Sequence, residues 1–122
     1  MPKKTIYKKD GREICVLDEK GSGGAHHRYM VYMTQPNATS FRARTVTTVE
    51  FQEGPVKEAG VNGCQNEDLL RIVIDRLEGF QAGEFECLEN AGALRNLRDA
   101  LECLESRTKN REMRGVEGRN MR

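Results

Sequence analysis

The sequence is poor in apolar residues and lacks the patterns of a membrane span or a secretory signal. Hydrophobic residues make up 37% of the 122 residues, and charged residues make up 32%. No run approaches the roughly 18 apolar residues of a membrane-spanning helix, so we expect no span and no membrane partner. The basic start of the chain is not followed by an apolar segment, so we expect no secretory signal. So little apolar material predicts a thin core, which a homo-oligomer would supplement.

Recognisable metal-binding and catalytic patterns are also missing. The His26-His27 pair has no carboxylate or cysteine at ligand spacing, so we expect a surface or strand-start role. Gly21–Gly24 lacks the Gly-Lys-Ser/Thr ending of a phosphate-binding loop and is interpreted as a linker. No Ser/His/Asp, Cys/His or paired-carboxylate arrangement stands out. We therefore expect neither an enzyme nor a bound metal or cofactor. The four cysteines form no Cys-x-x-Cys pair; they are Cys15, Cys64, Cys87 and Cys103.

The first half of the chain, residues 1–63, predicts a small antiparallel β-sheet. Asp10-Gly11 is a hairpin-turn signal between two short strands, and alternation or β-branched content marks two more. Val56–Ala59, after the Gly54-Pro55 turn, is expected to be a short edge strand. The four main strands are expected at Thr5–Tyr7, Glu13–Asp18, His27–Thr34 and Arg44–Phe51.

The second half predicts a helical hairpin over residues 64–116, followed by a tail at 117–122. Asn66 is a plausible N-cap for a first helix that runs to Gln81, and Ala82-Gly83 breaks the helical pattern. A short break between two long helices implies an antiparallel pair. The fold class is therefore α+β, with the sheet first. The second helix carries an apolar seam with alternating spacings of three and four, at Leu94, Leu97, Leu101 and Leu104.

A group of arginines follows this seam. Residues 107–122 contain six basic and two acidic residues, in a chain whose net charge is +1. Arg107, Arg111 and Arg114 recur at spacings of four and three, which predicts one helix face that continues the seam. One interpretation is a solvated helix end, where the macrodipole favours cations. The other is phosphate binding, because guanidinium forks match phosphate oxygens.

Two aromatic residues and an asparagine flank the break between the helices. Phe80 and Phe85 either fill the end of the hairpin with apolar surface or offer a stacking platform for a base. Asn90 is mildly unfavourable inside a helix. It either faces water or forms a hydrogen bond to a base edge or a ribose hydroxyl.

Several short motifs form a recognisable series when they are read in order. They are Phe51–Glu58 (FQEGPVKE), Gly60–Gly63 (GVNG), Asn66–Leu70 (NEDLL), Phe80–Gly83 (FQAG), Cys87–Asn90 (CLEN) and Arg114–Gly118 (RGVEG). Together they resemble the first described type of phage Thoeris anti-defence protein, whose helical hairpin is shared with an anti-CBASS sponge. The resemblance covers roughly residues 51–118.

The resemblance implies a sponge in the host bacterial cytoplasm. Such proteins bind cyclic ADP-ribose isomers without degrading them, and members can also hold cyclic di- or trinucleotides of CBASS at a separate site. They are homo-oligomers, either dimers or trimers of dimers, with the signal held between subunits. Carried onto this sequence, the ligand-binding residues are Phe80, Asn90, Arg107 and Arg111.

Two rival functions stay open at this point. One is a small nucleic-acid-binding protein that uses the basic ends of the chain, although an acidic helical middle argues against a partner of polymeric nucleic acid. The other is a phage protein that docks on a host protein through the helical hairpin.

Overall fold

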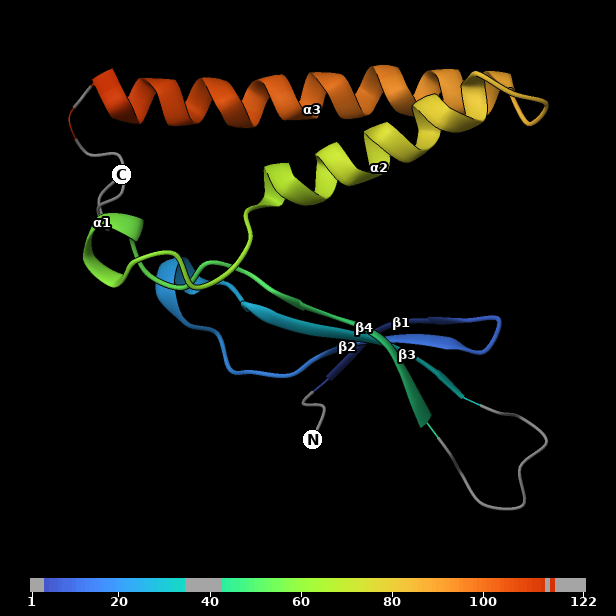
Figure 1. The fold of residues 1–122 in the computed structure, drawn as a ribbon. Coiled ribbons are helices and arrows are strands. Elements are labelled where there is room, and N and C mark those ends of the chain that lie inside the picture. The colour runs from blue at the N-terminus through green and yellow to red at the C-terminus, as the bar shows by residue number, and fades with distance from the viewer. Residues whose placement is uncertain (1–3, 35–42, 114, 116–122) are drawn as a thin grey trace. The chain divides into compact units, whose positions relative to one another are not determined.

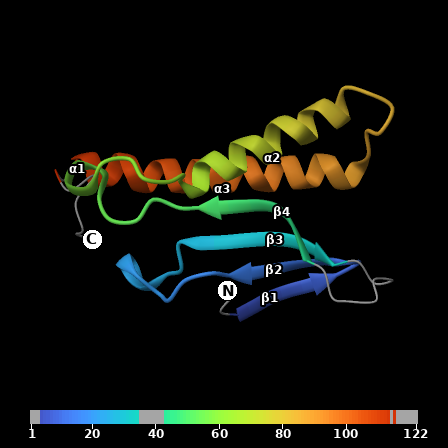
Figure 2. The ribbon, with the colours of Figure 1, turned by 60° about the horizontal axis from the view of Figure 1, so that its bottom comes forward.

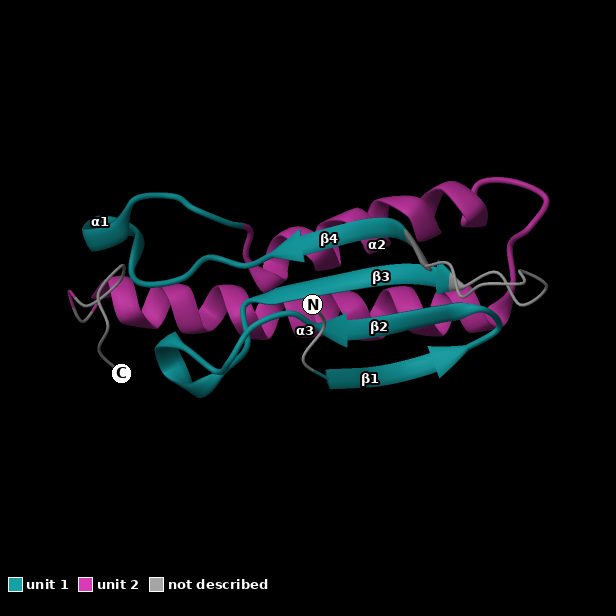
Figure 3. Cartoon of the chain, turned by 90° about the horizontal axis from the view of Figure 1, so that it is seen from below, with its two compact units in different colours: residues 1–63 teal, residues 64–122 magenta. Residues whose placement is uncertain are grey.

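The computed structural model describes residues 4–34, 43–113 and 115, and it divides the chain into two compact units. Unit 1 comprises residues 1–63 and unit 2 comprises residues 64–122 (Figure 3). Residues 35–42 lie outside the described residues, as do Arg114 and the predicted tail at 117–122.

Unit 1 contains a four-stranded antiparallel sheet in the order β1-β2-β3-β4 (Figure 2). The β1–β2 turn is made by Asp10 and Gly11, with φ of 52° and 76°. Two consecutive positive φ angles suit a tight hairpin turn, whose twist matches that of the flanking strands. The antiparallel sheet predicted from the sequence is confirmed. Its strands are β1 (Lys4–Lys9), β2 (Arg12–Val16), β3 (Arg28–Thr34) and β4 (Ala43–Glu50).

The sheet has a small interior that includes a polar cluster. Cys15 is fully buried and Tyr32 is 7% exposed. The Cys15 thiol donates to the Tyr32 hydroxyl at 3.5 Å, and the Thr5 hydroxyl donates to the Glu13 carboxylate at 2.6 Å. Hydrogen bonds from Thr5 and then Tyr32 lower the pKa of Glu13, while the hydrogen bond with Cys15 and burial raise the pKa of Tyr32 well above its ordinary value. Both side chains therefore keep their usual charge states at neutral pH.

The segment after β4 is helical where the sequence predicted an edge strand. Val56–Ala59 forms a short helix, α1, so the strand prediction is wrong. The Ala59 N–H donates to the Pro55 carbonyl at 2.7 Å, and the Gly60 N–H donates to the Val56 carbonyl at 2.8 Å. Gly60, with φ of 73°, ends the turn in a conformation that favours glycine. The flanking turn residues outweigh the β-propensity of Val56.

Side-chain amides close the loop that contains α1. The Asn62 amide both accepts from the Glu53 N–H and donates to the Glu53 carbonyl, each at 2.8 Å. The Gln52 amide accepts from the Asn62 N–H at 2.9 Å and donates to the Gly60 carbonyl at 2.8 Å. These bonds satisfy backbone groups that no strand pairs with.

Unit 2 is a hairpin of two helices, α2 (Asn66–Gln81) and α3 (Leu88–Met113) (Figure 1). The N-cap of α2 is Gln65, so the prediction of Asn66 is wrong by one residue. The Asp68 carboxylate accepts the Gln65 N–H at 2.8 Å. A carboxylate three residues after the cap satisfies a free N–H and suits the helix dipole, which explains why the helix begins one residue earlier than the sequence suggested.

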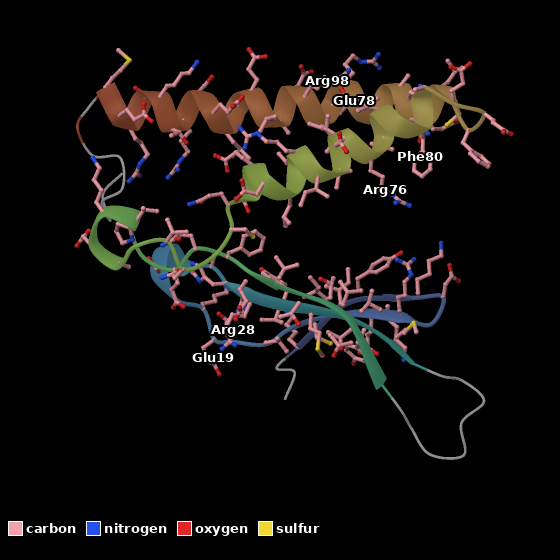
Figure 4. The ribbon with its side chains drawn as sticks, viewed as in Figure 1. Glu19, Arg28, Arg76, Glu78, Phe80 and Arg98 are labelled. Carbon is pink, nitrogen blue, oxygen red and sulfur yellow. The ribbon has the colours of Figure 1, made fainter. Side chains whose placement is uncertain are left out.

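Two ion pairs link the helices of the antiparallel hairpin. Arg71, near the start of α2, pairs with Glu105 near the end of α3 at 2.8 Å. Glu78, near the end of α2, pairs with Arg98 at 2.6 Å (Figure 4). The predicted seam positions of α3 are buried or half-buried, and Leu94 is the deepest at 5% exposed. None of the helices in the described ranges is long and apolar enough to cross a membrane.

The tight approach of Gly63 to Phe51 predicts a strong effect of a single methyl group. A Cβ at Gly63 would overlap the Phe51 carbonyl and lie 2.7 Å from the Gln52 nitrogen. We expect Gly63→Ala to lower the free energy of unfolding by roughly 1–3 kcal/mol, as overpacked sites do. The measurement is chemical denaturation of the full chain.

Gly79→Ala is the matched control, because its Cβ would meet nothing within 4 Å on a helix. That variant should be neutral or more stable, by up to roughly 1 kcal/mol. Equal stability of the Gly63 and Gly79 variants would contradict the close approach.

Candidate ligand-binding site

The turn end of the hairpin brings two aromatic rings together. Phe80, in the last turn of α2, and Phe85, in the interhelical loop, meet edge to face with centroids 6.5 Å apart and planes at 82°. Phe80 is half-buried, whereas Phe85 is 73% exposed. Such a pair offers apolar and π surface at the molecular surface, where a planar group can stack.

The Gln81 side chain holds the loop that carries Phe85. Its carbonyl oxygen accepts the Cys87 N–H at 2.9 Å, and its amide donates to the Cys87 carbonyl at 3.2 Å. This two-point contact copies the pairing of a β-bridge, so it ties the last residue of α2 to the start of α3. The position of Phe85 relative to Phe80 depends on this closure.

Asn90 lies beside this aromatic pair, in the first turn of α3. Its backbone N–H donates to the Cys87 sulfur at 3.4 Å, and its side-chain amide reaches the Phe85 carbonyl at 3.5 Å. The Cys87 carbonyl also accepts the Ala91 N–H at 3.2 Å, so Cys87 caps the helix. Asn90 is half-buried, and its side-chain amide contacts the backbone of Phe85, whose ring meets Phe80. Phe80, Phe85 and Asn90 therefore form one group, defined here as the aromatic end.

The arginines predicted to bind phosphate lie at the opposite end of α3. Arg107 is separated from Asn90 by 17 residues of one continuous helix, Leu88–Met113. At 1.5 Å per residue their Cα atoms are about 25 Å apart. Arg107 and Arg111, defined here as the basic end, are thus not brought together with Phe80 and Asn90 within one chain.

The two arginines differ in their surroundings. Arg111 is half-buried and engaged in an interaction, whereas Arg107 is exposed. The position that continues the apolar seam after Leu104 is held by Thr108, whose hydroxyl donates to the Leu104 carbonyl at 3.3 Å. Arg111 lies in the seam, whereas Arg107 lies beside it, so the prediction that the arginines continue the seam is wrong for Arg107.

The histidine pair serves the local structure of unit 1. The His26 Nδ1 atom lies 2.9 Å from the Asp18 carbonyl oxygen, and the His27 N–H donates to the Asp18 carboxylate at 3.0 Å. His27 precedes β3 and is 8% exposed, so it is a buried strand-start residue. Burial raises the pKa of Asp18, but hydrogen bonds from the His27 and Arg28 N–H groups outweigh it and leave the pKa lowered. In the described part of the chain, no three His, Cys, Asp or Glu side chains gather to hold a metal ion.

Comparison with known proteins agrees with the hairpin geometry. Residues 45–109 match the family described as Acb2/Tad1, hairpin domain. The chain belongs to this family. The match includes Phe80, Asn90 and Arg107 and ends before Arg111.

A relative is Thoeris anti-defense 1 of Bacillus phage SBSphiJ7, which is 55% identical over 76 residues. The aligned part covers 62% of this chain and 54% of the relative. The chain thus spans about half of the length of the curated relative that it matches.

Two residues that contact or hold the aromatic end carry no predicted role from the sequence. The helical pattern marks Gln81 only as the end of a helix, and it does not mark Arg76, whose guanidinium lies over the Phe80 ring. A glutamine directly before an Ala-Gly break is one signal that could have been used, because a side-chain amide can replace a missing backbone partner in a turn.

The Gln81 contact predicts a graded response to substitution. Gln81→Ala removes both hydrogen bonds to Cys87 and should lower stability by about 1–2 kcal/mol. Gln81→Glu keeps the oxygen that accepts the Cys87 N–H but loses the donor. Hydrogen exchange of the Cys87 amide should be fast in the alanine variant and slow in the glutamate variant. Equal exchange rates in the two variants would rule out this closure.

Proposed function

We propose that the protein is a phage anti-defence sponge that binds cyclic nucleotide immune signals and releases them intact. The observation that carries the proposal is the division of complementary groups between the two ends of α3. An aromatic pair and an amide lie at one end, and two arginines lie about 25 Å away. Membership of the family and the name of the phage relative support the direction of the proposal.

The two groups match the parts of a cyclic ADP-ribose isomer. Phe80 offers a face on which the base stacks, and Asn90 offers an amide for a ribose hydroxyl or a base edge. Arg107 and Arg111 neutralise the two phosphates. Cyclic di- and trinucleotides of CBASS present the same bases and phosphates, so they form a second ligand class within the same proposal.

Two copies of the chain must contribute to each site. A single cyclic ADP-ribose isomer cannot span the distance of about 25 Å between the two ends of one α3. A second copy in antiparallel orientation places its basic end against the aromatic end of the first copy. Apolar side chains on α2 outside the hairpin seam suit such an assembly, because Ile72 is 64% exposed and Val73 is 43% exposed. The proposed protein is therefore a homo-oligomer, either a dimer or a hexamer built from dimers.

The affinity that a sponge needs also favours a shared site. Nanomolar binding corresponds to about 12 kcal/mol. One stack and a few charged hydrogen bonds from a single copy fall short after the cost of association. Closing two copies over one ligand supplies both ends and removes water from the charged contacts, which strengthens them. The proposed binding involves no bond cleavage and takes place in the host cytoplasm, where the signals act.

The sponge predicts that ligand disappears and returns unchanged. We expect the protein to remove a free cyclic ADP-ribose isomer from solution at equal concentration, and heating should release the same compound. Chromatography of the heated mixture checks this. A linear product would favour an enzyme instead, and a shift of duplex DNA or RNA probes without cyclic ADP-ribose binding would favour the nucleic-acid rival.

The shared site predicts complementation between two inactive variants. Phe80→Ala and Arg107→Ala should each weaken binding by roughly 1–3 kcal/mol. When the two variants are co-expressed with different tags and purified as mixed pairs, one site combines both defects and the other combines both intact groups. Titration calorimetry should then recover about half of the tight sites, as the two-fold symmetry of a pair requires.

The control is a pair assembled from two differently tagged copies of one variant, which should recover no tight site. If mixed pairs also recovered none, the phosphate and base contacts would have to come from one chain. That result would overturn the division of the site between copies. Sequestration is tested separately, by the removal and release of the free ligand.

A further inference from the structure

Arg76 lies over the ring proposed to stack the base. Its guanidinium carbon is 4.9 Å from the centroid of Phe80, one turn further along α2. Both side chains project from the same side of α2 and lie next to each other (Figure 4). This contact is of the cation–π type, in which a guanidinium covers an aromatic face.

The placement of Arg76 differs from that of neighbouring arginines on the hairpin. Arg71 pairs with Glu105, and Arg98 pairs with Glu78. Their guanidinium groups bridge the two helices and stabilise the hairpin itself. Arg76 is exposed and faces an aromatic ring, so its guanidinium is positioned where a ligand on Phe80 would meet it.

We propose that Arg76 forms the second wall of a base-binding site, so that a purine lies between its guanidinium and the Phe80 ring. This inference rests on the proposed function, since it refines how the same site holds its ligand. Two stacked layers need about 7 Å between ring and guanidinium, at roughly 3.5 Å per layer. The observed 4.9 Å therefore has to widen by about 2 Å, which a flexible exposed side chain can do.

The chemistry of arginine suits this position. The guanidinium is planar and weakly hydrated, so it stacks on aromatic and base faces, whereas the lysine ammonium is a strongly hydrated point charge. In the free protein the same contact keeps the Phe80 face from being fully exposed to water. When a base enters, the contact between Arg76 and Phe80 is replaced by two contacts, one between the base and the guanidinium and one between the base and the ring.

The test compares Arg76→Ala, Arg76→Lys and the control Arg98→Ala in the full chain. Each removes or alters one exposed arginine of the hairpin, but Arg98 is engaged with Glu78 and not with the ring. Affinity for a cyclic ADP-ribose isomer is measured by calorimetry at low and high salt. Thermal unfolding monitored by circular dichroism establishes that each variant folds.

We expect Arg76→Ala to weaken binding about tenfold, and Arg76→Lys should weaken it nearly as much. Arg98→Ala should stay within about twofold of the wild type. The loss in the Arg76 variants should persist at high salt, because stacking depends little on screening. Unchanged or tighter binding by Arg76→Ala would overturn the proposal, since the side chain would then be neutral or a cover that the ligand displaces.

A second result would also overturn it. If Arg76→Lys restores wild-type affinity and the loss in Arg76→Ala fades at high salt, Arg76 contacts a phosphate and does not stack. Failure of the proposed function is recognisable separately, because the wild-type protein would then bind no cyclic ADP-ribose isomer at either salt concentration.

Discussion

The unbroken length of α3 is the constraint on which the rest of the hairpin depends. The helix runs for 26 residues without a proline, so it is a rod of roughly 39 Å. The aromatic end lies at the start of α3, and the basic end lies in the last two turns of α3. No side-chain motion closes the distance of about 25 Å between the two ends. In the proposed function, a ligand that needs both ends is therefore held by two copies, so the proposed oligomer is part of the binding chemistry.

Most of the architecture could be predicted because its signals are local. Period-two alternation, the Asp10-Gly11 turn and the helical repeat of leucines each act within a few residues, and the structure contains the strands, turn and helix that they predict. The errors occurred where two local signals compete. Val56 favours a strand, but Pro55 and Gly60 close a helical turn around it. Asn66 is a good cap, but Asp68 satisfies the N–H of Gln65 instead.

The candidate site was predictable in residue type more than in arrangement. Phe80 and Asn90 do lie together, because the closure by Gln81 brings residues from both helices to one place. Sequence spacing alone could not show that Arg107 lies beside the seam while Thr108 occupies it, since the two positions differ by only one residue. Nor could it show Arg76 over Phe80, because a spacing of four permits contact without requiring it.

The apolar seam of α3 is not continued by leucines at the basic end, and this change fits the proposed binding of phosphate. After Leu104 the half-buried positions are Thr108 and Arg111, where leucines would pack better. The same end of the hairpin carries the acidic first turn of α2, Glu67 and Asp68. Arg111 is half-buried at this end and engaged in an interaction, whereas Arg107 is exposed. Local departures of this kind concentrate where function, and not packing, determines the residue. Here the partial burial lowers the dielectric around a guanidinium without removing it from reach, which is the condition under which a phosphate contact gains most.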